Sequence, residues 1–146
     1  MEKNRKELKV LSIVILAFIA LTIIKALVTV CVNGLPQATE IPQGMTAETV
    51  KIVAIVFLVL GFVVAIPQIY VGVKGILVAN GTASGKGHII WALILAILAG
   101  VSVISGISEL TKGFSVDSVL GVLDPAIDLA LFVSFYVYAR RVANET

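Results

Sequence analysis

The chain has 146 residues, of which 59% are hydrophobic and only 14% are charged, and its mean hydropathy is +1.08. Soluble domains carry about 25% charged residues, so this composition excludes an ordinary soluble domain and indicates an integral membrane protein. The net charge of +2 is too small for a nucleic-acid-binding surface, and the single cysteine, Cys31, excludes an internal disulfide and a cysteine-based metal site.

Four apolar runs predict four membrane-spanning helices. About 20 helical residues cross a hydrocarbon core roughly 30 Å thick, and each run is long enough for that. We expect one all-α domain over residues 1–146, an antiparallel four-helix bundle with helices at approximately 8–32, 50–79, 89–107 and 119–140. The connections between the runs are short, so nothing remains for a soluble domain.

The first run, 8–32, follows a basic segment of the kind that precedes a secretion signal. Its apolar stretch is longer than the ~7–15 residues of a signal peptide, so we expect a retained helix. Thr22, Lys25 and Thr29 share one stripe of this helix. A charge near the bilayer centre costs at least about 2.5–3.5 kcal/mol. Lys25 therefore predicts an acidic partner on another helix.

The second and third runs carry small residues at helical spacing. In lipid, helices associate by close backbone approach at small residues rather than by apolar burial. We therefore predict that these two helices pack as a left-handed hairpin, with Val71 facing away from the contact. The alternative is that glycine is simply common in membrane helices. The predicted packing positions are Gly61, Ala65, Gln68, Gly72, Gly75, Ala92, Ala96, Ala99 and Gly106.

Pro67 removes a helical hydrogen bond and should bend the second helix. The stretch that it begins, PQIYVGVKG (67–75), resembles the motif of PQ-loop transporters, in which a Pro-Gln pair kinks a helix that runs toward the cytoplasm. The resemblance implies a small-solute transporter assembled as a dimer of three-helix units. The chain departs from that pattern because an extra helix precedes the motif and the turn after it is glycine-rich.

That turn, GTASGKG (81–87), has some features of a phosphate-binding loop, but it has one residue too few between its glycines and no preceding strand. We interpret it as a flexible turn. His88, the only histidine, follows it and has no partner at a metal-binding spacing. We expect His88 to cap or flank the third helix.

The fourth run contains VLDPAIDLAL (122–131), which places Asp124 and Asp128 on one stripe. Counted from the outer helix ends, Asp124 lies about 7 Å deep, Lys25 about 10 Å and Asp128 about 13 Å. These three residues form the candidate intramembrane charge site, in which we expect Lys25 to pair with Asp128. Two accounts of the surplus carboxylate stay open. Either one aspartate is protonated, or Asp124 is the N-cap of a helix that begins at Pro125, after a separate segment over 116–123.

Basic residues concentrate on one predicted side of the membrane. The first and third connections contain only Lys51 and Lys112. By the positive-inside rule, both termini should be cytoplasmic, and the short loops favour a bacterial cytoplasmic membrane. The N-terminal arm, the second connection and the end of the fourth helix hold Lys3, Arg5, Lys6, Lys9, Lys74, Lys86, Arg140 and Arg141.

No catalytic set, metal site or cofactor motif is recognisable, so we do not expect an enzyme. We expect a non-enzymatic membrane component, either a self-associating bundle or an accessory subunit of a larger membrane complex. Its partners would be the lipid bilayer, a second copy or another membrane protein, and not nucleic acid. The alternative is a transporter or channel for a small solute or ion that uses Lys25, Asp124 and Asp128. That alternative requires an oligomer or a cavity that reaches Asp128.

Overall fold

The computed structural model describes residues 2–33 and 44–145, and these ranges contain four helices and no strand. The helices are α1 (Glu2–Asn33), α2 (Ala47–Ala79), α3 (Gly87–Lys112) and α4 (Val116–Asn144). Each is long and apolar enough to cross a membrane. The prediction of an all-α chain with four such helices is confirmed, and the helices extend beyond the predicted bounds at most of their ends.

Two helices begin at hydroxyl caps, which satisfy backbone donors that a helix start leaves unpaired. The Thr46 hydroxyl accepts a hydrogen bond from the Thr49 N–H at the start of α2. Ser115 and Ser118 form a reciprocal capping box at the start of α4. Because α4 begins there and continues through Pro125, the interpretation of Asp124 as an N-cap is wrong.

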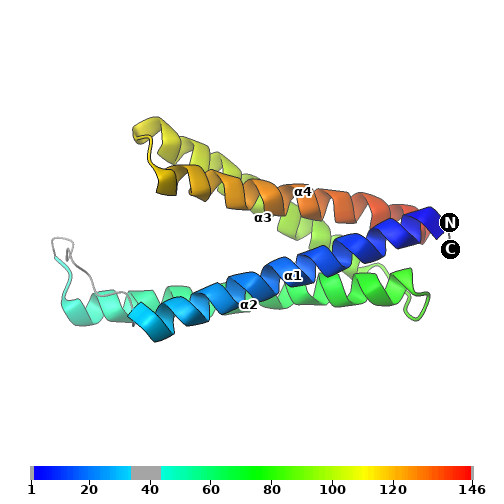
Figure 1. The fold of residues 1–146 in the computed structure, drawn as a ribbon, viewed down its shortest axis with the longest axis horizontal. Helices are drawn as coiled ribbons and strands as arrows, with labels where there is room; N and C mark the ends of the chain where they lie inside the picture. Colours follow the sequence, from blue (N-terminus) through cyan, green and yellow to red (C-terminus); the bar gives the residue numbers. More distant parts are fainter. Residues whose placement is uncertain (1, 34–43, 146) are drawn as a thin grey trace.

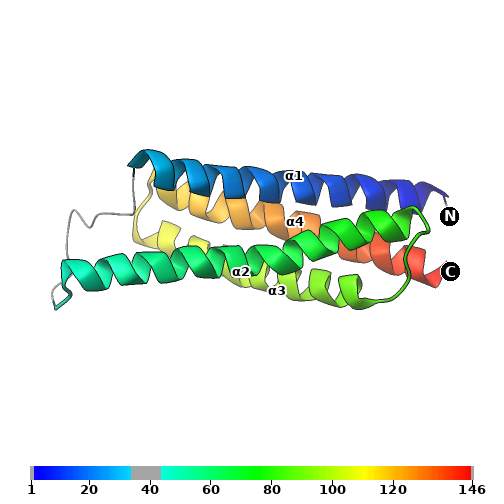
Figure 2. The same ribbon diagram turned by 90° about the horizontal axis from the view of Figure 1, so that it is seen from below.

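The helices form two antiparallel pairs, α1 with α2 and α3 with α4, and the most extensive contacts lie within these pairs (Figure 1). The pairs meet near both chain termini and separate toward the opposite end, so the bundle is V-shaped in that view. Figure 2 shows α2 changing direction about half-way along its length. Pro67 lies inside this helix, and the bend agrees with the one predicted from its missing N–H.

Burial divides the molecule into two halves. All buried residues of the described chain lie in residues 2–19, 71–99 and 132–145, which we call the terminal half. The described residues of the splayed half, within 20–33, 44–70 and 100–131, include no buried residue. The terminal half therefore forms the core of the described chain.

The core of the terminal half is centred on an aromatic ring. Phe135 is fully buried and lies edge-to-face against His88, with the ring centroids 6.1 Å apart. Ser12 of α1 is also fully buried, and its hydroxyl donates to the Leu8 carbonyl of its own helix. The polar group of Ser12 is thus satisfied locally, which lets α1 pack closely against its neighbours.

The small residues of α2 bring helices together, but not the helices that we predicted. An added Cβ at Gly72 would lie 2.6 Å from the Leu16 Cγ of α1. A Cβ at Gly75 would collide with Ser12 of α1 and with Phe135 of α4. Since α2 and α3 share far fewer contacts than either pair, the predicted close α2–α3 hairpin is wrong. The spaces that Gly72 and Gly75 leave on the surface of α2 are filled by side chains of α1 and α4.

Two further packing predictions have different outcomes along α2. Val71, which was expected to face away from the helix contacts, is fully buried, so that expectation is wrong. Gly61, in the splayed half, has no neighbouring atom within 4 Å of an added Cβ. Both flanks of α2 are covered near Gly72, whereas its stripe of small residues has no partner near Gly61.

The small residues of α3 face α4. Ala92, Ala96 and Ala99 are buried in the helix pair that makes the most extensive contacts. Further along, an added Cβ at Gly106 would lie 2.7 Å from the Gly121 carbonyl oxygen of α4. The two backbones therefore approach closely at this point, as small residues in membrane helices allow.

Candidate functional site

A polar cavity of about 290 Å³ lies where the terminal and splayed halves meet. Residues of α2, in one arm of the V, and of α3 and α4, in the other arm, form this cavity. Its polar groups come from all three helices: Gln68 from α2, Ser102 from α3, and Asp124 and Asp128 from α4. The rest of the lining is Val64, Leu95, Leu98, Ala99, Pro125 and Phe132.

The two aspartates lie on one face of α4, four residues apart, which places their Cβ atoms about 5–6 Å from each other. Asp124 is exposed, and Asp128 is half-buried near the middle of the helix. Neither carboxylate has an ion pair or a hydrogen bond to another residue in the part of the chain that the structure describes. Both are therefore available to a ligand or to water that enters the cavity.

Lys25, the third member of the candidate charge site, lies elsewhere. It is exposed on α1, in the splayed half, where the α3–α4 pair has separated from α1 in Figure 1 and α2 has separated from it in Figure 2. Within the described residues, no ion pair joins Lys25 to Asp124 or Asp128. Thr29, which shares the Lys25 stripe, donates its hydroxyl to the Lys25 carbonyl. The structure brings the two aspartates together and leaves out the lysine.

Pro125 shapes the wall of the cavity between the two aspartates. Because proline lacks an N–H, the Gly121 carbonyl has no helical donor one turn along α4. This carbonyl is the one that faces Gly106 of α3. A Cα–H of Gly106 can contact the freed oxygen, which is the kind of compensation that membrane helices need at an internal proline. The contact keeps α3 against α4 beside the cavity.

Two polar residues of the cavity, Gln68 and Ser102, were not part of the predicted charge site. Gln68 was placed among the helix-packing residues, yet its half-buried side chain lines the cavity beside the proline bend of α2. The Ser102 hydroxyl donates to the Leu98 carbonyl of its own helix, at 3.1 Å, and its oxygen can still accept a hydrogen bond. The sequence feature that could have identified Gln68 as a cavity residue is its position directly after the helix-internal Pro67.

The charge of the cavity is entirely negative. Two carboxylates, one amide and one hydroxyl supply its polar groups, and no lysine, arginine or histidine is among the residues that line it. Carboxylates inside a membrane segment are costly unless they meet a positive charge, a proton or water. The site is therefore suited to a small cation.

No protein-family model, curated protein or solved structure matches the chain. The resemblance of the stretch 67–75 to the PQ-loop motif thus gains no support from a family match.

Proposed function

We propose that this protein is a small multi-pass membrane protein that binds a small cation in the cavity between α2, α3 and α4 and passes it across the bilayer. The observation that carries the proposal is the position of Asp124 and Asp128 in one cavity that, among the described residues, holds no basic partner for them. The transporter alternative required a cavity that reaches Asp128, and this cavity meets that requirement.

The location of the cavity favours transport over a purely structural role. It lies near the middle of α4, beside helix-internal prolines in both α2 and α4. Where a membrane helix is bent or interrupted by a proline, it can expose polar backbone and side-chain groups to a ligand. Leu95, Ala99 and Phe132, which are buried in the terminal half, line one part of the cavity, and residues of the splayed half line the rest.

The direct test uses proteoliposomes and two probes, protons and ethidium. Vesicles with a trapped pH dye and a potassium gradient plus valinomycin report proton flux, and ethidium uptake reports an organic cation. We expect flux of at least one probe above empty vesicles, and a loss of at least tenfold in Asp128→Asn. Asp117→Asn removes the same charge at an exposed position outside the cavity and should keep the flux. Absence of flux for both probes, or equal loss in both variants, would contradict the proposal.

The orientation belongs to the same proposal. From the distribution of lysine and arginine, the terminal half should face the cytoplasm and the V should open outward. A reporter fused after Thr146 should read cytoplasmic, and one inserted next to Gly44 should read external. The opposite pattern would reverse the direction in which the cavity opens.

A second candidate function, a self-associating or accessory membrane component, is favoured by the unpartnered stripe of α2. Gly61 contacts nothing within 4 Å of an added Cβ, and Ile66 on the same helix is 65% exposed. Small residues in such stripes allow close approach of another helix in lipid. The test is subunit counting by single-molecule photobleaching in bilayers. Dimers that Gly61→Leu converts to monomers would support this candidate, and a monomeric native protein would exclude self-association.

A further inference from the structure

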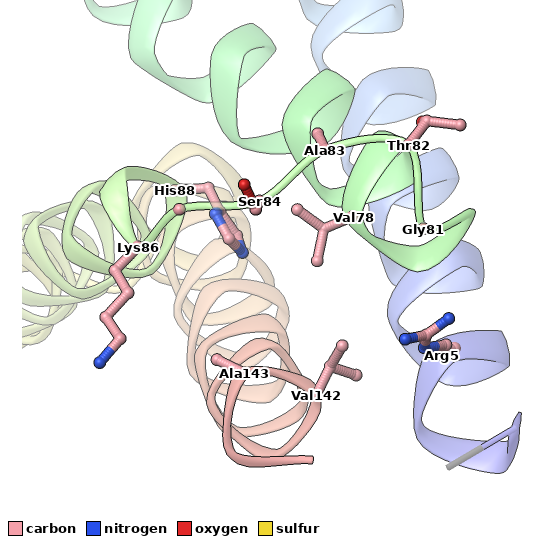
Figure 3. A pocket seen from close by; sticks show the side chains of 11 residues that line it. Arg5, Val78, Gly81, Thr82, Ala83, Ser84, Lys86, His88, Val142 and Ala143 are labelled. Carbon is pink, nitrogen blue, oxygen red and sulfur yellow. The ribbon is translucent and has the colours of Figure 1, made fainter. Parts of the chain in front are cut away.

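A second cavity, of about 420 Å³, lies at the outer edge of the terminal half, away from the aspartates. The glycine-rich turn between α2 and α3 covers one side of it, the last turn of α4 forms another, and Arg5 of α1 reaches its rim (Figure 3). Val78, Val142 and Ala143 supply apolar surface between these elements. By the positive-inside rule, this end of the bundle lies at the cytoplasmic membrane surface.

His88 projects into this cavity from the start of α3 (Figure 3). The side chain is 1% exposed, and neither ring nitrogen has a hydrogen-bond partner among the described residues. A buried donor or acceptor without a partner is destabilising, and native proteins rarely leave one unsatisfied. His88 was expected to cap or flank α3, but its side chain makes no cap. A polar group that enters the cavity can satisfy these nitrogens.

The surroundings of His88 are positively charged. Arg5 and Lys86 lie at opposite edges of the cavity, and neither forms an ion pair in the described part of the chain. Lys74, on α2, is close enough for its charge to act on His88. No aspartate or glutamate lines the cavity. A ligand that satisfies His88 must therefore be compatible with several cations.

The backbone adds further donors. In the described chain, the N–H groups of Ser84, Gly85, Lys86, Gly87 and His88 have no hydrogen-bond partner. Those of Gly87 and His88 belong to the first turn of α3, where the helix dipole favours negative charge. Free N–H groups at a helix start, together with an arginine, a lysine and a histidine, are the donor set that binds phosphoryl oxygens.

We propose that this cavity binds a phosphoryl group, held by Arg5, His88 and the backbone of the turn 81–87. Two sources share this chemistry, the headgroup of an anionic phospholipid and a free phosphate compound. The position at the membrane surface and the apolar wall of Val78 and Val142 suit a lipid, whose acyl chains would continue along the helices. The inference is independent of cation transport, because the two cavities share no residue.

The test follows the single histidine of the chain. The chain gives one imidazole Cε1–H signal in a proton–carbon correlation spectrum, recorded first in dodecyl maltoside micelles, which contain no phosphate. Phosphatidylglycerol is then added to the micelles in one arm, and inorganic phosphate is added in the other. A shift in the lipid arm alone identifies a headgroup site, and a shift in both arms identifies a general phosphoryl site. No shift in either arm would overturn the proposal.

Matched variants separate a built site from general attraction between charges. Arg5→Gln should weaken binding of the shifting ligand at least about tenfold, since a charge-assisted hydrogen bond is lost. Lys3→Gln removes the same charge from an exposed residue that does not line the cavity and should bind as the native protein does. Equal weakening in both variants would overturn the proposal. His88→Gln, with folding checked by gel filtration, should also weaken binding, and Arg5→Gln carries the test if this variant does not fold.

Discussion

The terminal half and the splayed half of the bundle contain the same kinds of residue, yet all buried residues of the described chain lie in the terminal half. Gly72 and Gly75 admit side chains of α1 and α4, whereas Gly61, on the same stripe of α2, has no neighbour. Apolar residues place a helix in the bilayer, but lipid solvates them as well as another helix does. Packing therefore depends on whether a glycine lies opposite a side chain that fills the space beside it. In the terminal half, Phe135 fills the space beside Gly75.

We expect the largest difference in stability between the two halves when one phenylalanine in each half is replaced by alanine. Phe135→Ala should lower the free energy of unfolding by about 3–5 kcal/mol, because it empties the centre of the core. Phe114→Ala makes the same substitution at a residue of the splayed half that is 88% exposed. This variant should change the free energy of unfolding by less than about 0.5 kcal/mol. Unfolding of both variants in detergent measures the contrast. Similar losses would mean that burial does not divide the protein as described.

A pair of glycines tests the same contrast by adding volume. Gly75→Leu forces a side chain into Ser12 and Phe135 and should cost toward the upper end of about 1–3 kcal/mol. Gly61→Leu enters open space and should be tolerated by the monomer. Gly72→Leu should fall between them, since part of what it meets is the flexible end of Leu16. Val73→Leu is the matched control on α2, because Val73 is 45% exposed whereas Val71 is buried.

A second pair of glycines examines the close approach of the α3 and α4 backbones in the splayed half. Gly106→Ala would place its Cβ against the Gly121 carbonyl, so we expect a loss of about 1–3 kcal/mol. Gly100→Ala lies on the same helix, and its Cβ would reach only an ordinary contact with Leu129, at 3.9 Å. Because alanine is the better helix former, this variant should be neutral or gain about 0.5–1 kcal/mol. Opposite signs in thermal unfolding would confirm that α3 and α4 stay joined beside the cavity.

The sequence was sufficient to predict the four helices, because long apolar runs report directly on hydrogen-bonded spans in lipid. It was not sufficient to predict the helix pairs. The stripe from Gly61 to Gly75 is compatible with any neighbour, and the presence of Leu16 and Phe135 opposite it is a property of the fold. A helix start at Asp124, one of the two accounts left open, was suggested because Asp-Pro is a strong start signal, whereas the capping box at Ser115 lies further upstream.

The candidate site was predicted in part for a similar reason. The spacing of Asp124 and Asp128 on a helix places both carboxylates on one face, whatever the fold. The partner of that face depends on which helices meet, and the splayed arrangement puts Gln68 and Ser102 there instead of Lys25. Equal depth in the membrane is a condition for an ion pair, but it does not establish one.

The smallest expected effect concerns that lysine. Lys25→Met should change the free energy of unfolding by less than about 0.5 kcal/mol, because the side chain is exposed and has no ion pair. Breaking a buried pair would instead cost about 3–5 kcal/mol. In a double-mutant cycle with Asp128→Leu, the two changes should add within about 0.5 kcal/mol, as distant sites do. A coupling well above that value would mean that Lys25 reaches Asp128 in the bilayer. The V would then have to close, and the cavity would no longer be free of cationic side chains. Additivity, together with loss of flux in Asp128→Asn, would leave Asp128 acting on the transported cation without Lys25.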